Sequence, residues 1–276
     1  MQPRLVRAGW LIAVPVCLVI AGESTRVAFH DLGPALIQQR LALVPRKLAD
    51  RKAAIESLFH EAGCEADRFA EQPVPHSKAP NQVCTLLGQT TSEIVVGGHY
   101  DSIEAGMGAV DDWSGAALLA SLYQSLDGPP RRHRIVFVAF AGEEGGLLGS
   151  REFVRKLAPE ELHWVRAMLN LECLGAGPPQ VWASRADPGL LNIYLRVVYA
   201  LHLAPSSVNV DRVGDDDSHP FLNAGIPVLT IHSLTQKTLP LLHNSRDNLT
   251  AIHAEDYYTA YRLAATYLAY LDTVLE

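Results

Sequence analysis

Residues 134–144 read Arg-Ile-Val-Phe-Val-Ala-Phe-Ala-Gly-Glu-Glu, an unbroken apolar run that leads into two adjacent glutamates. A continuous run of β-branched and aromatic residues is typical of a strand that is buried on both faces, as in a parallel sheet. Similar runs alternate with amphipathic segments along the chain, which predicts helices on both faces of the sheet. The expected fold class is therefore α/β, a three-layer α/β/α sandwich with a mixed, mostly parallel central sheet.

The other expected elements follow from the same patterns. Strands are predicted at residues 93–97, 134–140, 166–171, 180–183 and 227–231, and helices at 114–126, 147–157, 188–203 and 254–273. A helical pattern also covers residues 36–59, and Pro45 is expected to break it. The polar, proline-containing residues 71–82 are expected to form a loop between two edge strands.

Length and composition exclude several classes of protein. A chain of 276 residues with 48% hydrophobic and 19% charged residues is neither disordered nor fibrous. The net charge is −7 and no basic cluster exceeds a pair, so a nucleic-acid partner is not expected. Residues 35–276 are predicted to form a single domain.

The N-terminus differs from the rest of the chain. Arg4 and Arg7 precede an uncharged stretch over residues 8–22, which matches the length of a secretory apolar region. Residues 1–22 are therefore predicted to be a signal peptide or an N-terminal membrane anchor, with a buried helix as a third alternative. Either main alternative exports the chain. The expected location is periplasmic or extracellular, or membrane-anchored with the domain of residues 35–276 outside the cytoplasm.

Two cysteines fit this compartment. Cys64 and Cys84 would enter an oxidising space, where they either form a disulfide or stay as two buried thiols. Cys173 lies in an apolar run and is expected to be a small core residue.

Acidic and imidazole side chains gather near the predicted strand ends. They are His99, Asp111, Glu143, Glu144, Glu172 and, in a loop near the C-terminus, His243. Taken singly, most have structural explanations, such as a helix cap or a solvated surface pair. Open α/β sheets, however, bind ligands where their parallel strands end. Glu172 follows a buried strand, where a carboxylate is costly unless it is neutralised or binds a cation.

Together these residues indicate a metal site. Two imidazoles and three carboxylates in one crevice suit Zn²⁺, and a carboxylate that bridges two ions makes a two-metal site. One of the adjacent glutamates could then bind metal while its neighbour accepts the proton of a water molecule.

Five segments resemble those of metallopeptidase family 28, the co-catalytic zinc aminopeptidases, whose fold the glutaminyl cyclases share. They are residues 98–102 (Gly-His-Tyr-Asp-Ser), 108–115 (Gly-Ala-Val-Asp-Asp-Trp-Ser-Gly), 141–150 (with Glu143-Glu144), 170–172 (Asn-Leu-Glu) and 242–247 (Leu-His-Asn-Ser-Arg-Asp). Their order matches that of the family, although Val110 replaces the first aspartate of the Asp-Asp turn. The resemblance implies that residues 35–276 are a single zinc peptidase catalytic domain with a zinc exopeptidase fold and two zinc ions.

The resemblance also implies a role for each residue. Asp111 would bridge both ions, with His99 and Glu172 completing one site and Glu144 and His243 the other. Glu143 would be the general base that activates the metal-bound water, and Asp101 would orient the His99 imidazole. His219, in the segment 217–221, is expected to contact substrate, whereas Asp215 and Asp216 are expected to be solvated.

The implied reaction is hydrolysis of the N-terminal peptide bond of peptides with a free N-terminus. One alternative is a glutaminyl-peptide cyclotransferase with a single zinc, because residues 216–222 (Asp-Asp-Ser-His-Pro-Phe-Leu) resemble the cyclase pocket. The other is a non-catalytic binding domain of the same fold. Such a domain usually lacks ligands or the base, and here every expected position is filled.

Overall fold

The structure is a computed structural model that describes residues 14–20, 23–103 and 105–275, with side chains from residue 27 onward. Seven strands form the central sheet in the order β3-β4-β6-β5-β7-β9-β8. Their bounds are β3 Phe69–Gln72, β4 Asn81–Leu86, β5 Glu93–His99, β6 Arg134–Phe140, β7 Val165–Glu172, β8 Gln180–Val181 and β9 Val228–His232. The pairings give β4 and β8 the opposite direction to the other five strands, which confirms a mixed, mostly parallel sheet.

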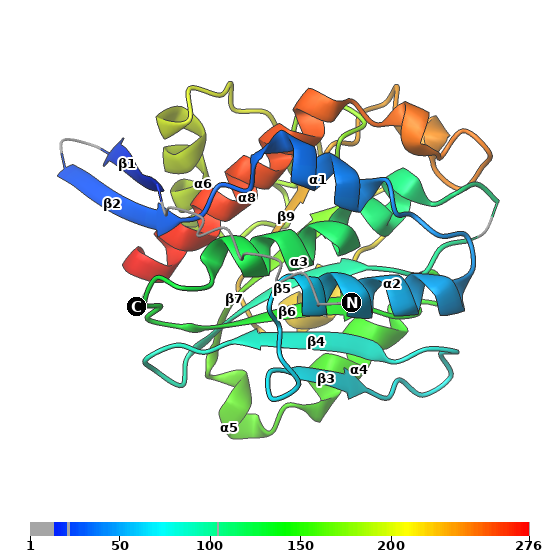
Figure 1. The fold of residues 1–276 in the computed structure, drawn as a ribbon, viewed down its shortest axis with the longest axis horizontal. Coiled ribbons are helices and arrows are strands. Elements are labelled where there is room, and N and C mark those ends of the chain that lie inside the picture. The colour runs from blue at the N-terminus through cyan, green and yellow to red at the C-terminus, as the bar shows by residue number, and fades with distance from the viewer. Residues whose placement is uncertain (1–13, 21–22, 104, 276) are drawn as a thin grey trace, which may run out of the picture.

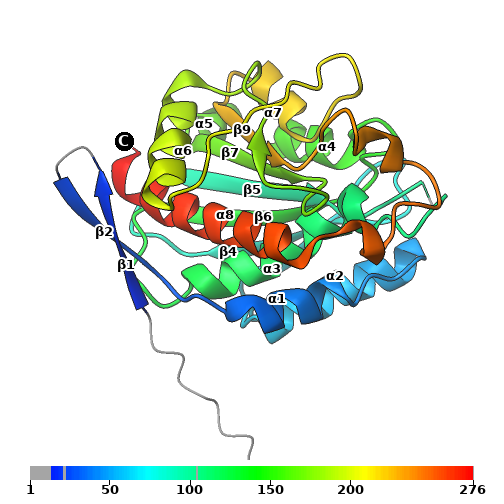
Figure 2. The same cartoon turned by 90° about the horizontal axis from the view of Figure 1, so that it is seen from above.

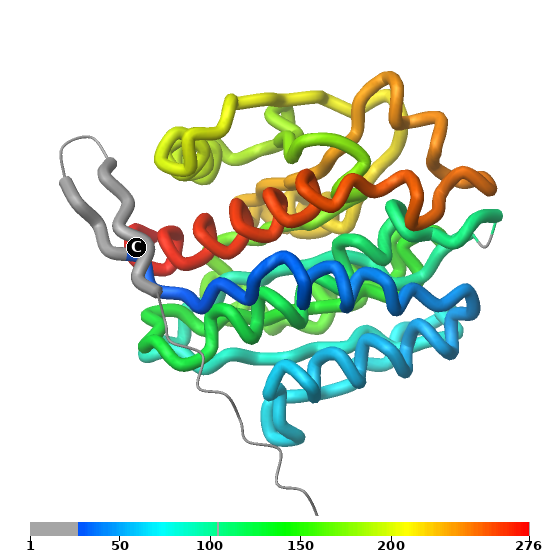
Figure 3. The backbone as a smooth tube through the Cα atoms, turned by 45° about the horizontal axis from the view of Figure 1, so that its top comes forward, coloured from blue at the N-terminus to red at the C-terminus, as the bar shows by residue number. Residues whose placement is uncertain are grey.

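Helices cover both faces of this sheet (Figures 1 and 2). One face carries α1 Gly33–Leu41, α2 Leu48–Glu61, α3 Ser114–Leu126, α6 Pro188–Ala200 and α8 Ala254–Val274. The other carries α4 Leu148–Lys156, α5 Pro159–Leu162 and α7 Ser218–Asn223. Figure 3 shows α1, α3 and α8 side by side, and they pack against one another. The three-layer α/β/α sandwich predicted from the sequence is thus confirmed.

The alternation of side chains explains why the central strands are apolar throughout. In β5, Ile94 and Val96 belong to the core under α3, while Val95 belongs to the core on the opposite face. In β6, Phe137 and Val138 divide between the same two cores. Both faces of each strand are therefore buried, as expected for the middle of a doubly covered sheet.

The structure confirms most of the predicted elements and corrects one of them. The break at Pro45 lies between the end of α1 at Leu41 and the start of α2 at Leu48. The loop predicted over residues 71–82 is shorter, because β3 and β4 pair with each other up to Gln72 and Asn81. Of the two strands that flank this loop, β3 lies at an edge of the sheet and β4 does not, since β4 also pairs with β6. The short helices α5 and α7 were not predicted.

Before the sheet, β1 Val14–Ile20 and β2 Glu23–Phe29 form an antiparallel hairpin. Because residues 14–20 are a strand, the alternative of a buried N-terminal helix is wrong for them. Residues 1–13 and 21–22 lie outside the described part of the chain, so the signal peptide or membrane anchor over residues 1–22 stays a prediction. No helix among the described residues is long and apolar enough to cross a membrane.

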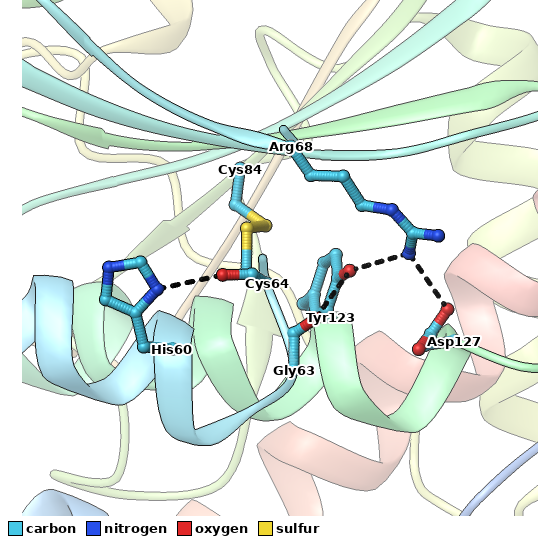
Figure 4. The surroundings of a disulfide bond; sticks show 7 residues. All are labelled: His60, Gly63, Cys64, Arg68, Cys84, Tyr123 and Asp127. Atoms are coloured by element: carbon cyan, nitrogen blue, oxygen red, sulfur yellow. Dashed lines mark hydrogen bonds and ion pairs between the residues drawn. A yellow bond between two sulfur atoms is a disulfide. The ribbon is translucent and has the colours of Figure 1, made fainter. Parts of the chain in front are cut away.

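A disulfide joins Cys64, just after α2, to Cys84 in β4, which confirms the pairing alternative (Figure 4). Both cysteines are fully buried. Near the bridge, Arg68 donates to the hydroxyl of Tyr123 on α3 at 3.0 Å and lies 3.5 Å from Asp127. The bridge therefore fixes the outer strands β3 and β4 to the helical layer.

A double variant, C64S/C84S, is expected to be less stable than the wild type by about 3 kcal/mol. The disulfide spans 20 residues, and closing a loop of that size removes about this much free energy from the unfolded state. Chemical denaturation under oxidising conditions measures the difference. Reducing agent should destabilise the wild type by a similar amount and leave the variant unchanged. Equal unfolding midpoints for the two oxidised proteins would contradict the prediction.

Candidate metal centre

Two of the predicted ligands are the last residues of neighbouring parallel strands. His99 ends β5 and Glu172 ends β7, and these strands pair in parallel. Both side chains consequently emerge at the same edge of the sheet, where His99 Nε2 lies 3.5 Å from Glu172 Oε1. His99 is fully buried.

Asp111 lies between two imidazoles. It comes from the turn Ala109–Trp113 in front of α3, where the Asp111–Asp112 peptide is cis and Gly108 has a φ of +58°. Its Oδ1 is 3.1 Å from His99 Nε2, and its Oδ2 is 3.0 Å from His243 Nε2. Each carboxylate oxygen of Asp111 thus faces a different histidine.

The two adjacent glutamates occupy the loop after β6. Glu144 Oε2 lies 3.4 Å from His243 Nε2, while Glu143 Oε2 lies 3.8 Å from His99 Nε2. Asp101 holds this loop, because its carboxylate accepts hydrogen bonds from the backbone N–H groups of residues 142, 143 and 144. Asp101 Oδ1 is 3.6 Å from His99 Nδ1, which is longer than a hydrogen bond.

The five predicted ligands therefore form two triads with one common member. The first is His99, Asp111 and Glu172, and the second is Asp111, Glu144 and His243. In each triad one potential ligand atom per residue lies within 4.8 Å of the others. No lysine or arginine of the described chain is within 4.0 Å of these carboxylates. Imidazole nitrogens and carboxylates without basic partners fit a pair of divalent cations such as Zn²⁺.

The sequence profile of Peptidase family M28 matches residues 81–268, which include all five ligand candidates. The chain belongs to peptidase family M28.

Curated relatives of this M28 chain are longer proteins. It is 32% identical to leupeptin-inactivating enzyme 1 of Streptomyces exfoliatus over 143 residues, which are 51% of this chain and 32% of that protein. It is 29% identical to aminopeptidase YwaD of Bacillus subtilis over 171 residues, which are 59% of this chain and 37% of that protein. The matches therefore span about a third of the length of these two relatives.

Solved structures share the fold of the M28 chain. The LapA aminopeptidase of Legionella pneumophila superimposes with a TM-score of 0.77 and 21% identity over 89% of this chain and 73% of that one. A glutaminyl cyclase from an Acidobacteriales bacterium gives a TM-score of 0.70 and 22% identity over 87% of this chain and 93% of that one. At these identities the likeness shows the fold alone.

Burial and the neighbouring charges together shift the pKa values of the M28 site. Burial raises the pKa of Glu143 to about 10 and that of Glu144 to about 7. Burial alone would lower the pKa of His99, but Glu143 and Glu172 outweigh it and hold this pKa well above its usual value. The hydrogen bond between His243 and Asp111 raises the pKa of His243. Without cations, the site therefore binds several protons near neutral pH.

The apparent affinity for Zn²⁺ is expected to fall as the pH is lowered. A cation needs neutral imidazoles and ionised carboxylates, so its binding releases the protons held by groups with raised pKa values. Each released proton weakens binding about tenfold per pH unit below the pKa of its group. Glu144, with a pKa of about 7, adds to this dependence only below neutral pH. Titration calorimetry in buffers of different ionisation enthalpy counts the protons. An affinity that is constant between pH 6 and 8 would contradict the assignment.

A cavity of about 290 Å³ adjoins both triads. Its polar wall includes Asp111, Glu143, Glu144, Glu172 and His243. Apolar side chains form much of the remaining wall: Trp182, Val210, Val213, Leu234, Leu239 and Leu242. Sequence patterns did not reveal this wall, since most of these side chains come from irregular segments after β8, between α6 and α7, and after β9.

Two predictions about the segment after Val213 need qualification. Asp216 is not solvated: only 1% exposed, it accepts hydrogen bonds from Ser218 and from the Thr230 hydroxyl at the cavity wall. Its neighbours on α7 and β9 bury it, which the acidic run in the sequence conceals. The His219 side chain instead pairs with Asp215 and is not among those lining the cavity. Contact between His219 and substrate stays a prediction.

Two further acidic residues shape the site without belonging to a triad. Asp247 accepts hydrogen bonds from the backbone N–H groups of Val110 at 2.7 Å and Asp111 at 3.2 Å. Asp112 accepts from the backbone N–H of Gly115 at 3.0 Å and of Cys173 at 2.9 Å. Both therefore fix the backbone that carries the metal-ligand candidates. Cys173 is buried as predicted, and it also lines the cavity.

Proposed function

We propose that this chain is a zinc-dependent aminopeptidase, which hydrolyses the N-terminal peptide bond of peptides. The observation that carries the proposal is the pair of triads that share Asp111 beside an apolar cavity. His99 and Glu172 would hold one ion with Asp111, and Glu144 and His243 the other. When bound, two zinc ions would polarise the scissile carbonyl and supply the nucleophilic water. Homologues named as aminopeptidases support this reaction class.

Glu143 would act as the general base. It lies at the edge of the first triad, lines the cavity, and belongs to neither set of ligands. Its carboxylate can accept a proton from the attacking water and return it to the leaving amine. Positive charge in the site would lower its raised pKa, because cations favour the ionised form. By binding three amides of residues 142–144, Asp101 would hold Glu143 in place.

The cavity supports two features of the substrate. Its apolar wall would accept an apolar side chain of the N-terminal residue, since burial of such a side chain is favourable. The carboxylates at its polar end would attract the free α-amine of the peptide. A substrate with a free N-terminus and an apolar first residue satisfies both.

A glutaminyl-peptide cyclotransferase is the second candidate. Its specific support is Asp216, a buried carboxylate at the cavity wall in the segment that resembles the cyclase pocket. The cyclase from the Acidobacteriales bacterium also superimposes over 93% of its own length. The aminopeptidase is favoured because the second histidine, His243, and Glu144 complete a second triad around Asp111.

Purified protein is expected to contain two zinc ions per chain and to release the first residue of leucyl-p-nitroanilide. Metal analysis and the release of p-nitroaniline measure these two properties. A glutaminyl peptide, followed by mass spectrometry for loss of ammonia, should remain uncyclised. One ion per chain together with cyclisation would instead support the cyclotransferase. Bound zinc with no turnover of either substrate would favour a non-catalytic binding domain.

We also propose that the protein works outside the cytoplasm, either released or held by residues 1–22. The Cys64–Cys84 disulfide supports this proposal, because such bridges persist in oxidising compartments. Fractionation of cells, with alkylation of free thiols before lysis, tests it. An alkylated Cys64–Cys84 pair in a cytoplasmic fraction would refute it.

A further inference from the structure

Arg51 of α2 is fully buried, and every one of its N–H groups has a backbone acceptor. A guanidinium carries five N–H donors in a fixed planar fork. The five acceptors are the carbonyl oxygens of Pro45 at 3.0 Å, Tyr100 at 2.9 Å, Asp101 at 3.2 Å, Met107 at 2.7 Å and Gly108 at 2.5 Å. Four of these carbonyls belong to one short segment of the chain.

That segment, residues 100–108, connects two metal-ligand candidates. It begins directly after His99, and it ends three residues before Asp111. Its last residue passes close to the guanidinium: a Cβ atom on Gly108 would lie 2.7 Å from Arg51 Nη2. Arg51 therefore contacts this segment at both of its ends, at residues 100–101 after His99 and at residues 107–108 before Asp111.

Asp247 binds the residues that follow this segment. It accepts hydrogen bonds from backbone N–H groups, whereas Arg51 donates to backbone carbonyls. Its carboxylate accepts from the N–H groups of Val110 and Asp111, and its own carbonyl accepts from the N–H of Met107. A buried cation thus holds carbonyl groups of the segment, and a buried carboxylate holds amide groups. The two contacts leave the Asp111 backbone little freedom to move.

The charge of Arg51 makes this arrangement unusual. Burial lowers its pKa, while Asp247 and Asp101 act to raise it. No carboxylate among the residues with described side chains forms an ion pair with it, and its guanidinium lies 5.6 Å from the Trp113 ring centroid. Arg51 contacts the backbone directly after His99, so its positive charge opposes the binding of cations there by simple repulsion. We therefore expect the hydrogen bonds of Arg51 to favour metal binding by more than this repulsion disfavours it.

We propose that Arg51 is a positioning residue for the metal centre, which sets the spacing of His99 and Asp111 by binding the backbone between them. The inference rests on the proposed function insofar as those residues hold zinc. The proposal predicts that the hydrogen bonds from the planar Arg51 guanidinium to backbone carbonyls affect metal affinity more than its positive charge does.

Two substitutions of Arg51 separate the effect of its planar set of N–H donors, the fork, from the effect of its positive charge. R51K keeps the positive charge and loses the planar fork, whereas R51M loses both. Arg131 provides the matched control, because it is also buried and donates to backbone carbonyls, those of Leu126 and Ala28, away from the triads. R131K and R131M therefore report the general cost of losing a buried arginine. The readouts are Zn²⁺ affinity and stoichiometry by competition with a chelator, the visible spectrum of the Co²⁺-loaded protein, and the melting temperature without metal.

Both Arg51 variants are expected to bind Zn²⁺ about 10–100-fold more weakly and to alter the Co²⁺ spectrum, as loss of outer contacts typically does. The Arg131 variants should lower the melting temperature and leave both metal readouts unchanged. If R51M bound Zn²⁺ as tightly as the wild type or more tightly, the hydrogen bonds of Arg51 would not support metal binding and the proposal would be overturned. Equal weakening by the Arg131 variants would overturn it too.

Two further measurements keep the test decisive. If R51M does not fold, D247N loosens the same segment from its amide side and should weaken Zn²⁺ binding; unchanged affinity in D247N and R51K would refute the proposal. If the wild type itself binds no metal, the proposed function fails. Hydrogen exchange at residues 107–111 then decides the role of Arg51, because it should speed up in R51K and not in R131K.

Discussion

An E143Q variant is expected to keep its metal ions and to lose about 10²–10⁴-fold in turnover, the usual contribution of a general base. Glutamine preserves the shape of the side chain and cannot take up the proton of the attacking water. Because Glu143 belongs to neither triad, zinc content should stay at the wild-type value. Turnover of leucyl-p-nitroanilide and metal analysis of the same sample measure both effects.

The neighbouring residue supplies the matched control for this substitution. Glu144 is a member of the second triad, so E144Q should lose zinc as well as activity. E160Q, on the exposed helix α5, should lose neither. Wild-type activity in E143Q would remove Glu143 from its assigned role, and loss of zinc in E143Q would make it a ligand.

A D111A variant is expected to lose both cations, and with them all measurable activity. Asp111 presents one oxygen to His99 and the other to His243, so its removal takes a ligand from both triads at once. The loss of affinity should exceed the roughly 10–100-fold typical of outer contacts. Zinc stoichiometry, measured by titration calorimetry of the metal-free protein, should fall from two toward zero.

Variants that remove a ligand from only one triad serve as the comparison for D111A. E172A and H243A each remove a ligand from one triad only, so each should retain one ion of higher affinity. D111A should therefore be more severe than either. Two ions bound to D111A with unchanged affinity would show that the carboxylate does not bridge the sites.

The fold and the ligand candidates at the strand ends could be predicted because their signals are local. Burial on both faces makes β5, β6 and β7 apolar throughout, and the parallel arrangement of strands then brings residues at their ends, such as His99 and Glu172, to one edge. Asp111 and His243 required the resemblance to a family, since nothing in their immediate sequence shows that they meet.

Contacts between segments far apart in the chain could not be predicted, because they leave no local pattern in the sequence. Arg51 resembles any basic residue on an amphipathic helix, and only the structure shows it on the carbonyls after His99. Asp216 lies in an acidic run that is typical of a surface loop, yet α7 and β9 bury it. Residues 14–20 lie in the apolar stretch whose length also fits a signal or anchor segment, and their pairing with β2 makes them a strand.

The ligand candidates come from five loops and strand ends that are widely separated in the sequence, and only Asp111 is common to both triads. Cations bound there would act as cross-links among the loops at one end of the molecule. Ions that bind only the folded chain stabilise it in proportion to the logarithm of their free concentration. Resistance of this protein to heat and to digestion would consequently follow the zinc supply of its surroundings, and a chelator would open that end of the molecule to proteases first.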